Sequence, residues 1–179
     1  RHAPWCAVSP HNGLLYTSGF SFVWTLRAFR HEIASRALRL ELDHELERRD
    51  GYGEPVRFVR VQGGAFSAAT GLFYLVNDEG TGDSGGIFVF DGRTGVQLGR
   101  IWIDYRRGWG QELEGITACD RDDRRAPSVG GQVHTVMISN PTATTDLWIK
   151  HHRVPLEKVI RMKRPEMQVR PLQGRGSGR

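Results

Sequence analysis

Short apolar runs separated by glycine-containing turns dominate the pattern of hydrophobic and polar positions along this chain. Residues 87–90 form a continuous apolar run between Gly85-Gly86 and Asp91-Gly92, which is typical of a buried strand. Residues 96–103 alternate apolar and polar side chains, as expected for an outer strand. This pattern predicts an all-β protein.

The chain also contains an internal repeat. Residues 7–16 align without a gap with residues 65–74, at an offset of 58 residues, and 5 of the 10 positions are identical. A weaker third copy begins about 50 residues later, at residues 115–117, and continues at residues 133–138. In each copy two short strands joined by a turn are followed by a third strand, at residues 25–29, 87–90 and 147–151.

Three or four antiparallel strands per repeat are typical of the blades of a β-propeller, in which each blade packs against its neighbours. We therefore expect a fragment of about three four-stranded antiparallel blades, at residues 5–55, 56–108 and 109–153. Three blades leave two unpaired sides. We expect missing blades or a partner chain to complete the ring.

Residues 31–49 allow two interpretations. The segment is rich in Ala, Leu, Glu and Arg, and Ile33, Ala37 and Leu40 fit the spacing of one helix face. Residues 38–42 also alternate leucine with charged side chains, as a strand would, and the repeat places a fourth strand here. We favour a strand or an irregular insertion, because tertiary pairing often overrides intrinsic propensity.

The net charge of +5 is concentrated at one end of the chain. Residues 153–179 contain 8 Lys or Arg and 2 acidic residues, whereas residues 1–152 contain 17 basic and 18 acidic residues. Residues 154–179 have the composition of a disordered basic tail. We expect nucleic-acid binding only through this tail. No apolar run approaches the roughly 18 residues that span a membrane, so no membrane span is expected.

Three segments of the sequence resemble the openings of successive blades in bacterial and fungal propeller proteins. They are residues 5–18, residues 61–67, and Gln-Glu-Leu-Glu-Gly-Ile-Thr at residues 111–117, which is similar to a Glu-x-Glu-Gly-[Ile/Leu] segment. The set resembles the six-bladed TolB-like propellers and the esterase-like phytase and gluconolactonase-type propellers, over roughly residues 5–153. This resemblance implies the fold and favours an extracellular or cell-envelope location. The resemblance does not distinguish between functions, because the superfamily contains both hydrolases and binding domains.

Residues just before the predicted first strands would surround one mouth of the central channel, where propellers usually bind ligands. They are Trp5, Gln62, Glu112 and Glu114. Glu112 and Glu114 would face the same side of a strand, and such close like charges are costly unless a cation or an arginine offsets them. They are therefore candidate calcium ligands or acid/base groups, and the resemblance implies that Glu114 ligates the metal. The alternative is that Glu114 bonds to the backbone of a neighbouring blade.

These observations favour a module that binds a small molecule or a protein at the channel mouth, with Trp5 and Gln62 as binding residues and no catalytic site. The alternative is a calcium-dependent hydrolase of the lactonase or phytase-like type that uses Glu112 and Glu114. A third hypothesis is a structural or surface domain without a small ligand. A tight divalent site would favour the hydrolase, and a large apolar patch would favour a binding module.

Other motifs are weaker. Acidic loops at residues 77–85 and 120–123 offer oxygen ligands for calcium but do not match an EF-hand. Residues 82–86, Gly-Asp-Ser-Gly-Gly, resemble a serine-protease nucleophile segment, but no His and Asp partners can be assigned. The five tryptophans, with Tyr105 and Trp109 near Arg106 and Arg107, are candidates for a stacking surface for sugar or nucleotide.

Histidine and cysteine residues are expected to be structural. The histidines at positions 11, 134, 151 and 152 are scattered, and the adjacent pair His151-His152 cannot share one face of a strand, so they do not predict a metal site. Cys6 and Cys119 lie in blades that are too far apart for a disulfide, and no zinc-binding spacing is present.

Overall fold

The computed structural model describes residues 3–34, 37–78, 85–103, 111–120, 133–139 and 146–154. These residues form eleven β-strands and no helix, which confirms the prediction of an all-β fold. It follows that the described part of the chain contains no helix with the length and apolarity to cross a membrane. The predicted basic tail lies outside the described residues, apart from Val154 at its start.

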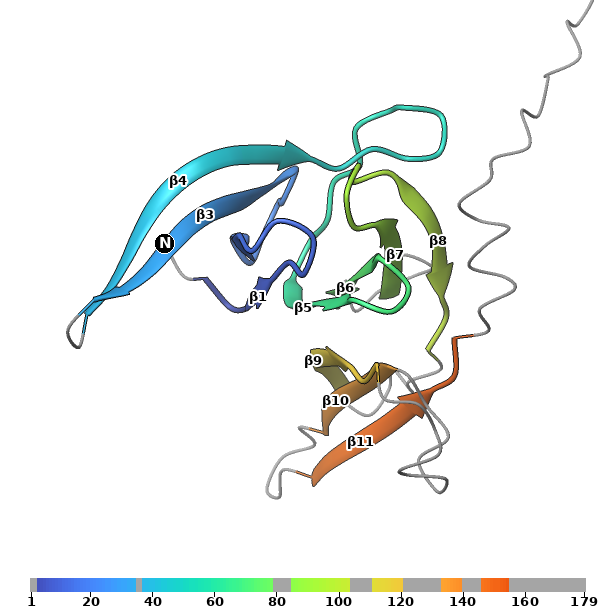
Figure 1. The fold of residues 1–179 in the computed structure, drawn as a ribbon. Coiled ribbons are helices and arrows are strands. Elements are labelled where there is room, and N and C mark those ends of the chain that lie inside the picture. The colour runs from blue at the N-terminus through green and yellow to red at the C-terminus, as the bar shows by residue number, and fades with distance from the viewer. Residues whose placement is uncertain are drawn as a thin grey trace, which may run out of the picture.

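The strands form three antiparallel sheets, in each of which the strands follow chain order (Figure 1). Sheet I contains β1 (Cys6–Val8), β2 (Leu15–Thr17), β3 (Thr25–Ala34) and β4 (Ala37–Glu47). Sheet II contains β5 (Val61–Ser67), β6 (Leu72–Asn77), β7 (Gly86–Asp91) and β8 (Gln97–Ile101). Sheet III contains β9 (Gln111–Ala118), β10 (Val133–Ser139) and β11 (Asp146–His152). Sheet III therefore has three strands within the described residues, where four were predicted.

The internal repeat has a structural counterpart in the first turn of sheets I and II. The Gly13 amide donates to the Ser9 carbonyl at 2.9 Å, and the Gly71 amide donates to the Ser67 carbonyl at the same distance. Both glycines have positive φ angles, 69° and 65°, which residues other than glycine rarely adopt. The offset of 58 residues therefore aligns two turns of the same geometry.

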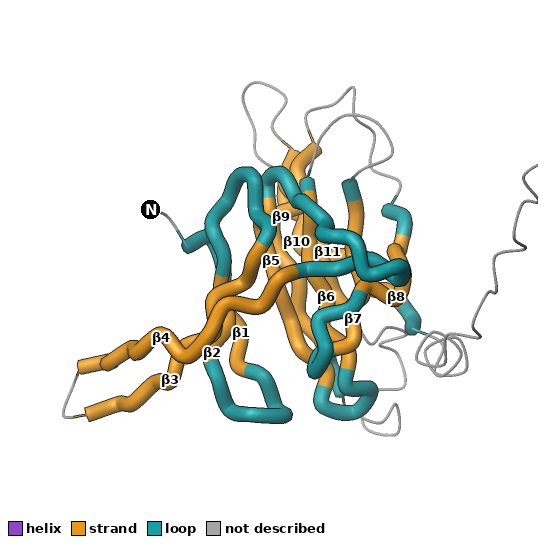
Figure 2. The backbone as a smooth tube through the Cα atoms, turned by 90° about the horizontal axis from the view of Figure 1, so that it is seen from above, coloured by secondary structure: helices purple, strands orange, loops and turns teal. Residues whose placement is uncertain are grey.

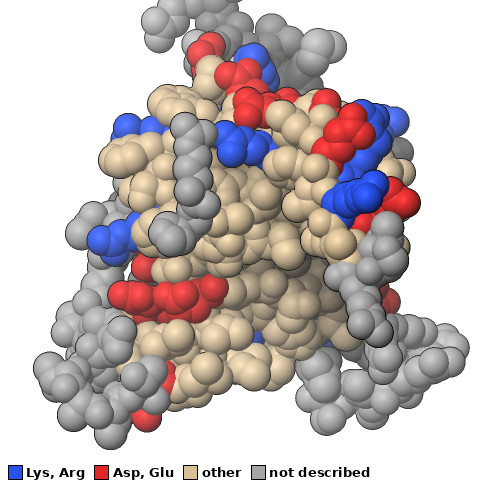
Figure 3. Space-filling view, turned by 90° about the vertical axis from the view of Figure 1, so that its left-hand side faces the viewer, with Lys and Arg blue, Asp and Glu red and all other residues tan. Residues whose placement is uncertain are grey.

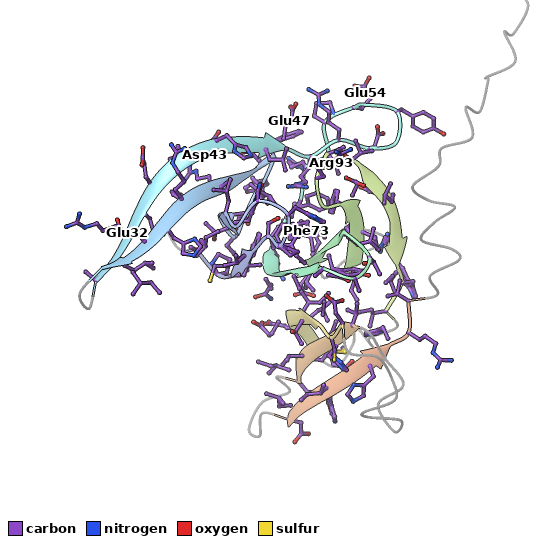
Figure 4. All side chains as sticks on the ribbon, in the orientation of Figure 1. Glu32, Asp43, Glu47, Glu54, Phe73 and Arg93 are labelled. Carbon is purple, nitrogen blue, oxygen red and sulfur yellow. The ribbon has the colours of Figure 1, made fainter. Side chains whose placement is uncertain are left out.

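Sheet II is the middle layer of the three sheets. One face of sheet II packs against sheet I and the other against sheet III, so β6 is buried along its whole length. Phe73 of β6 lies in the layer between sheets I and II (Figure 4). The first strands β1, β5 and β9 contact one another in sequence order. Val154 packs into the layer between sheets II and III.

Residues 31–34 and 37–47 confirm the strand interpretation of the ambiguous segment. They continue β3 and β4 into a long hairpin that protrudes from the sheets (Figure 2). Ile33 pairs with Leu38 on one face of this hairpin, and Arg30 on the other face forms ion pairs with Glu41 and Asp43. Because pairing satisfies the backbone of both strands, it outweighs the helix propensity of the composition.

Arg48 follows β4 and is buried between sheets I and II. Its guanidinium carbon lies 5.2 Å from the ring centroid of Phe73 and 4.9 Å from that of Phe90. Burial lowers the pKa of this guanidinium to about 9. Its Nε is buried without a hydrogen-bond partner among the described residues. Cation–π contact with the two rings therefore offsets part of its lost hydration.

The outer faces of sheets I and III carry exposed apolar side chains. On sheet I, Val8, Leu15, Phe29 and Leu42 form one cross-strand row, and Val8 and Leu42 are each 51% exposed. On sheet III, Leu147 and Ile149 are 61% and 57% exposed. No described residue packs over these two faces, in contrast to the two faces of sheet II.

Candidate functional site

The candidate site lies where the beginning of β5 in sheet II runs beside the middle of β9 in sheet III. Gly63 allows this approach because it has no side chain. A Cβ atom at Gly63 would lie 3.0 Å from the backbone nitrogen of Ile116 and 3.1 Å from the Cα of Gly115. Both distances are shorter than ordinary van der Waals contact. The backbones of β5 and β9 are therefore in direct contact at this point.

Matching irregularities in β5 and β9 bring two polar side chains together. Val61 pairs with Asn77 and Gly63 with Val76, which leaves Gln62 as an extra residue in β5. Leu113 and Gly115 similarly pair with consecutive residues of β10, which leaves Glu114 as an extra residue in β9. Such bulges redirect a side chain out of the regular alternation. The Nε2 of Gln62 donates to the Oε1 of Glu114 at 3.0 Å.

Glu112 completes the group. Its carboxyl group lies within hydrogen-bonding reach of that of Glu114, while Leu113 between them is fully buried. Burial raises the pKa of Glu114, and the hydrogen bond with Glu112 and the charges of Glu112 and Asp78 raise it further. The hydrogen bond from Gln62 acts in the opposite direction. The pair can therefore hold a proton between two carboxyl groups, as close carboxylates do elsewhere.

The structure thus brings together three of the four residues selected from the sequence, Gln62, Glu112 and Glu114. Trp5 has a different position. It is 8% exposed, packs against Gly64 and Phe73, and donates its indole N–H to the Ser18 hydroxyl at 2.9 Å. Trp5 therefore supports β5 from the side of sheet I, and its contact with a ligand stays a prediction.

Sequence reasoning included Trp24 among five tryptophans that could form a stacking surface, but it did not identify the exposed aromatic group that Trp24 forms with Phe22. Phe22 and Trp24 are 63% and 48% exposed, and the guanidinium of Arg57 lies 5.3 Å and 5.9 Å from their ring centroids. They lie in the segment between β2 and β3, whose Phe20 carbonyl accepts a 2.8 Å hydrogen bond from the Val61 amide at the start of β5. The clustering of aromatic residues at positions 20–24 was the available signal.

A second arginine and tryptophan stack at the end of β8. The Arg100 guanidinium lies 4.8 Å from the ring centroid of Trp102, which is 54% exposed, and 5.3 Å from that of Phe88. The predicted stacking residues near Arg106 and Arg107 lie outside the described residues. Figure 3 views the molecule from the left-hand side of Figure 1 and shows a hollowed surface with acidic side chains grouped at one border.

The predicted calcium loops can be followed only in part. Asp120 at the start of the second loop accepts hydrogen bonds from the Ser67 hydroxyl at 2.6 Å and from the Ala68 amide at 2.6 Å, so it caps the turn between β5 and β6. Asn77 of the first loop accepts a 3.0 Å hydrogen bond from the Val59 amide. Residues 79–84, which include the Gly-Asp-Ser part of the protease-like motif, and residues 121–123 lie outside the described part of the chain.

The fit of the site to calcium can be judged from its oxygen donors. Glu112, Glu114 and Gln62 offer side-chain oxygens, whereas calcium takes about 6–8 oxygen ligands. Within the ranges that the structure describes, no group of three or more His, Cys, Asp or Glu side chains is placed to hold a metal ion. The described residues therefore provide at most part of a calcium site.

Two of the histidines are not scattered. His134 and His151 are direct cross-strand partners in β10 and β11, although 17 residues separate them in the chain. His152 lies on the opposite face of β11, beside Thr135. Cys6 and Cys119 are both free thiols. Register between strands, which brings the two histidines together, could not be read from the sequence alone.

The sequence matches no protein-family model and no curated protein.

Proposed function

We propose that the three sheets are consecutive blades of a β-propeller, related to the TolB-like and gluconolactonase-type propellers that the sequence resembles. Three features support this proposal. The sheets are antiparallel with their strands in chain order, they stack face to face in the same order, and their first strands lie side by side. The apolar outer faces of sheets I and III are what further blades would cover.

The chain acts, in this proposal, as a non-catalytic module that binds a ligand where the beginning of β5 runs beside the middle of β9. The observation that carries it is the Gln62–Glu114 hydrogen bond, which spans two sheets beside Glu112 in a partly exposed position. A carboxyl pair that shares a proton offers both a donor and acceptors. The exposed rings of Phe22 and Trp24 on sheet I add flat apolar surfaces for stacking.

This chemistry favours an uncharged polyhydroxylated ligand, such as a sugar. Hydroxyl groups can pair with the carboxyl and amide groups, and the C–H face of a sugar ring can pack on an aromatic ring. The charge of Glu112 and Glu114 opposes an anionic ligand such as a sugar phosphate. The intact protein's ligand would therefore be selected by hydroxyl pattern more than by charge.

The test is thermal unfolding of the protein with a panel of neutral sugars and the corresponding sugar phosphates. A neutral sugar at 100 times its Kd should stabilise the folded state by about 2.7 kcal/mol. Glu114→Gln and Gln62→Ala should lose this stabilisation. Glu41→Gln is the matched control, because Glu41 is an exposed carboxylate of the protruding hairpin. An equal response in Glu114→Gln, or no response of the parent to any sugar, contradicts the proposal.

One observation favours the alternative of a calcium-dependent hydrolase, namely the raised pKa of Glu114 beside Glu112. A carboxyl group that stays protonated next to an ionised one can work as an acid/base pair. Calcium bound at this pair would stabilise the ionised form and lower that pKa. A large stabilisation of the parent by calcium, absent from Glu114→Gln, together with hydrolysis of lactones or phosphoesters, would select this alternative.

A further inference from the structure

The outer face of sheet III carries a pair of histidines that the proposed ligand site does not use. His134 of β10 and His151 of β11 are directly opposite each other, with ring centroids 4.6 Å apart and ring planes at 85°. The two Nδ1 atoms face each other in hydrogen-bonding contact. Both side chains lie on the face that no described residue covers, next to the exposed Ile149.

Two imidazole nitrogen atoms in such close contact need a proton or a metal ion between them. In a hydrogen bond, one imidazole carries its proton on Nδ1 and the other accepts it, because a proton on both atoms would be repulsive. The imidazole that accepts this hydrogen bond on its Nδ1 is neutral. A neutral imidazole is also the form that binds a transition metal.

We propose that His134 and His151 form a two-histidine site for a divalent transition-metal ion, bound through their Nδ1 atoms. Imidazole suits zinc, copper and nickel, and two tetrahedral nitrogen ligands at about 2.0–2.1 Å from the ion lie about 3.3 Å apart. Both rings are on an exposed strand pair, so a small rotation of either ring reaches this separation. The metal then takes the place of the shared proton.

The remaining positions of the ion face solvent. Thr117 of β9 is the next residue in the same cross-strand row, beside His134, and its hydroxyl is the one side-chain oxygen of that row. Among the described residues no third His, Cys, Asp or Glu completes the ligand set. Water therefore fills the other positions, and the affinity should be that of two imidazoles, with copper(II) bound more tightly than zinc.

The test uses the tag-free protein with zinc or copper(II), followed by calorimetry and thermal unfolding. One ion should bind per chain, and an ion at 100 times its Kd should raise the ratio of folded to unfolded protein about 100-fold. That change corresponds to a rise of about 5–10 °C in the Tm of a chain of this size. With copper(II), the electron paramagnetic resonance spectrum should show coupling to two imidazole nitrogens.

His134→Asn and His151→Asn should each abolish binding, whereas His152→Asn should retain it. His152 is the matched control, because it neighbours His151 on the same strand but faces the other side of the sheet, where its Nε2 lies 3.0 Å from the Thr135 hydroxyl. Calcium and magnesium, which prefer oxygen, should give no response at these histidines. Equal zinc or copper binding in parent and His134→Asn, or no binding in the folded parent, overturns the proposal and leaves a metal-free hydrogen-bonded pair.

Discussion

Replacement of Gly64 by Ala tests whether sheets I and II pack as closely as described. A Cβ atom at this position would lie 2.5, 2.7 and 2.9 Å from three carbon atoms of the Trp5 ring. Favourable carbon–carbon contacts lie at about 3.5–4.0 Å, so the indole must move by about 1 Å. The ring is 8% exposed and lies against Phe73, so it has little room for that movement.

The expected cost follows from what the movement disrupts. Trp5 would lose the 2.9 Å hydrogen bond from its indole nitrogen to the Ser18 hydroxyl, worth about 1 kcal/mol. Overpacking of a filled core adds about 1–3 kcal/mol. We therefore expect Gly64→Ala to lower the free energy of unfolding by about 2–4 kcal/mol, and the Tm by about 5–15 °C.

Urea unfolding followed by circular dichroism measures this change. Gly19→Ala is the matched control, because no atom lies within 4 Å of the added Cβ and its backbone is not left-handed, so it should change stability by less than about 0.5 kcal/mol. The three clashing atoms belong to the six-membered ring of the indole. In a Trp5→Phe background, Gly64→Ala should therefore cost less. A neutral Gly64→Ala, or an equal cost in both backgrounds, would refute the packing described here.

Three further predictions concern charged residues, each measured by urea unfolding. Asp120→Ala should destabilise the protein by about 1–3 kcal/mol, because the Ser67 hydroxyl and the Ala68 amide in the turn between β5 and β6 lose their hydrogen-bond acceptor. Asp120→Asn should recover part of this loss. Because the pKa of Glu114 is raised in the folded state, its contribution to the free energy of unfolding is full below about pH 4 and is lost as the pH rises through the folded-state pKa. Glu114→Gln should therefore reduce the decrease in stability over this pH range, and an unchanged pH profile of stability contradicts this prediction. Arg48→Met should be neutral or stabilising by up to about 2 kcal/mol at pH 7, because it removes a buried charge whose Nε has no hydrogen-bond partner among the described residues, and a loss above about 2 kcal/mol contradicts this reasoning.

The strands of sheet II could be predicted because their signals are local. Residues 87–90 are apolar and bounded by glycines, and they lie within β7 as expected. The repeat located the turn before β6 because Gly71 adopts a positive φ angle there, as Gly13 does in sheet I. The choice of strand for residues 31–49 was also correct, since the alternation of residues 38–42 reflects the two faces of a paired strand.

The orientation of individual side chains could not be predicted in the same way. Trp5 was expected at the channel mouth because it precedes a first strand; its packing on Gly64 was not foreseen, and its contact with a ligand stays a prediction. The pairing of His134 with His151 depends on the register of β10 and β11, which no spacing within one strand reveals. These contacts depend on neighbouring sheets and strands, so a single strand pattern does not contain them.

The bulges at Gln62 and Glu114 explain why the candidate site is asymmetric. They are 52 residues apart and lie at the same point of β5 and β9, each directly before a glycine at which the two backbones meet. The offset of 58 residues that aligns sheet I with sheet II places Pro4 at the position of Gln62, and proline has neither an amide side chain nor a backbone N–H. Sheet I therefore cannot extend the polar group. Its contribution to the same end of the molecule is aromatic, through Phe22 and Trp24. We therefore expect that the proposed ligand, if it contacts all three sheets, has one polar and one apolar face.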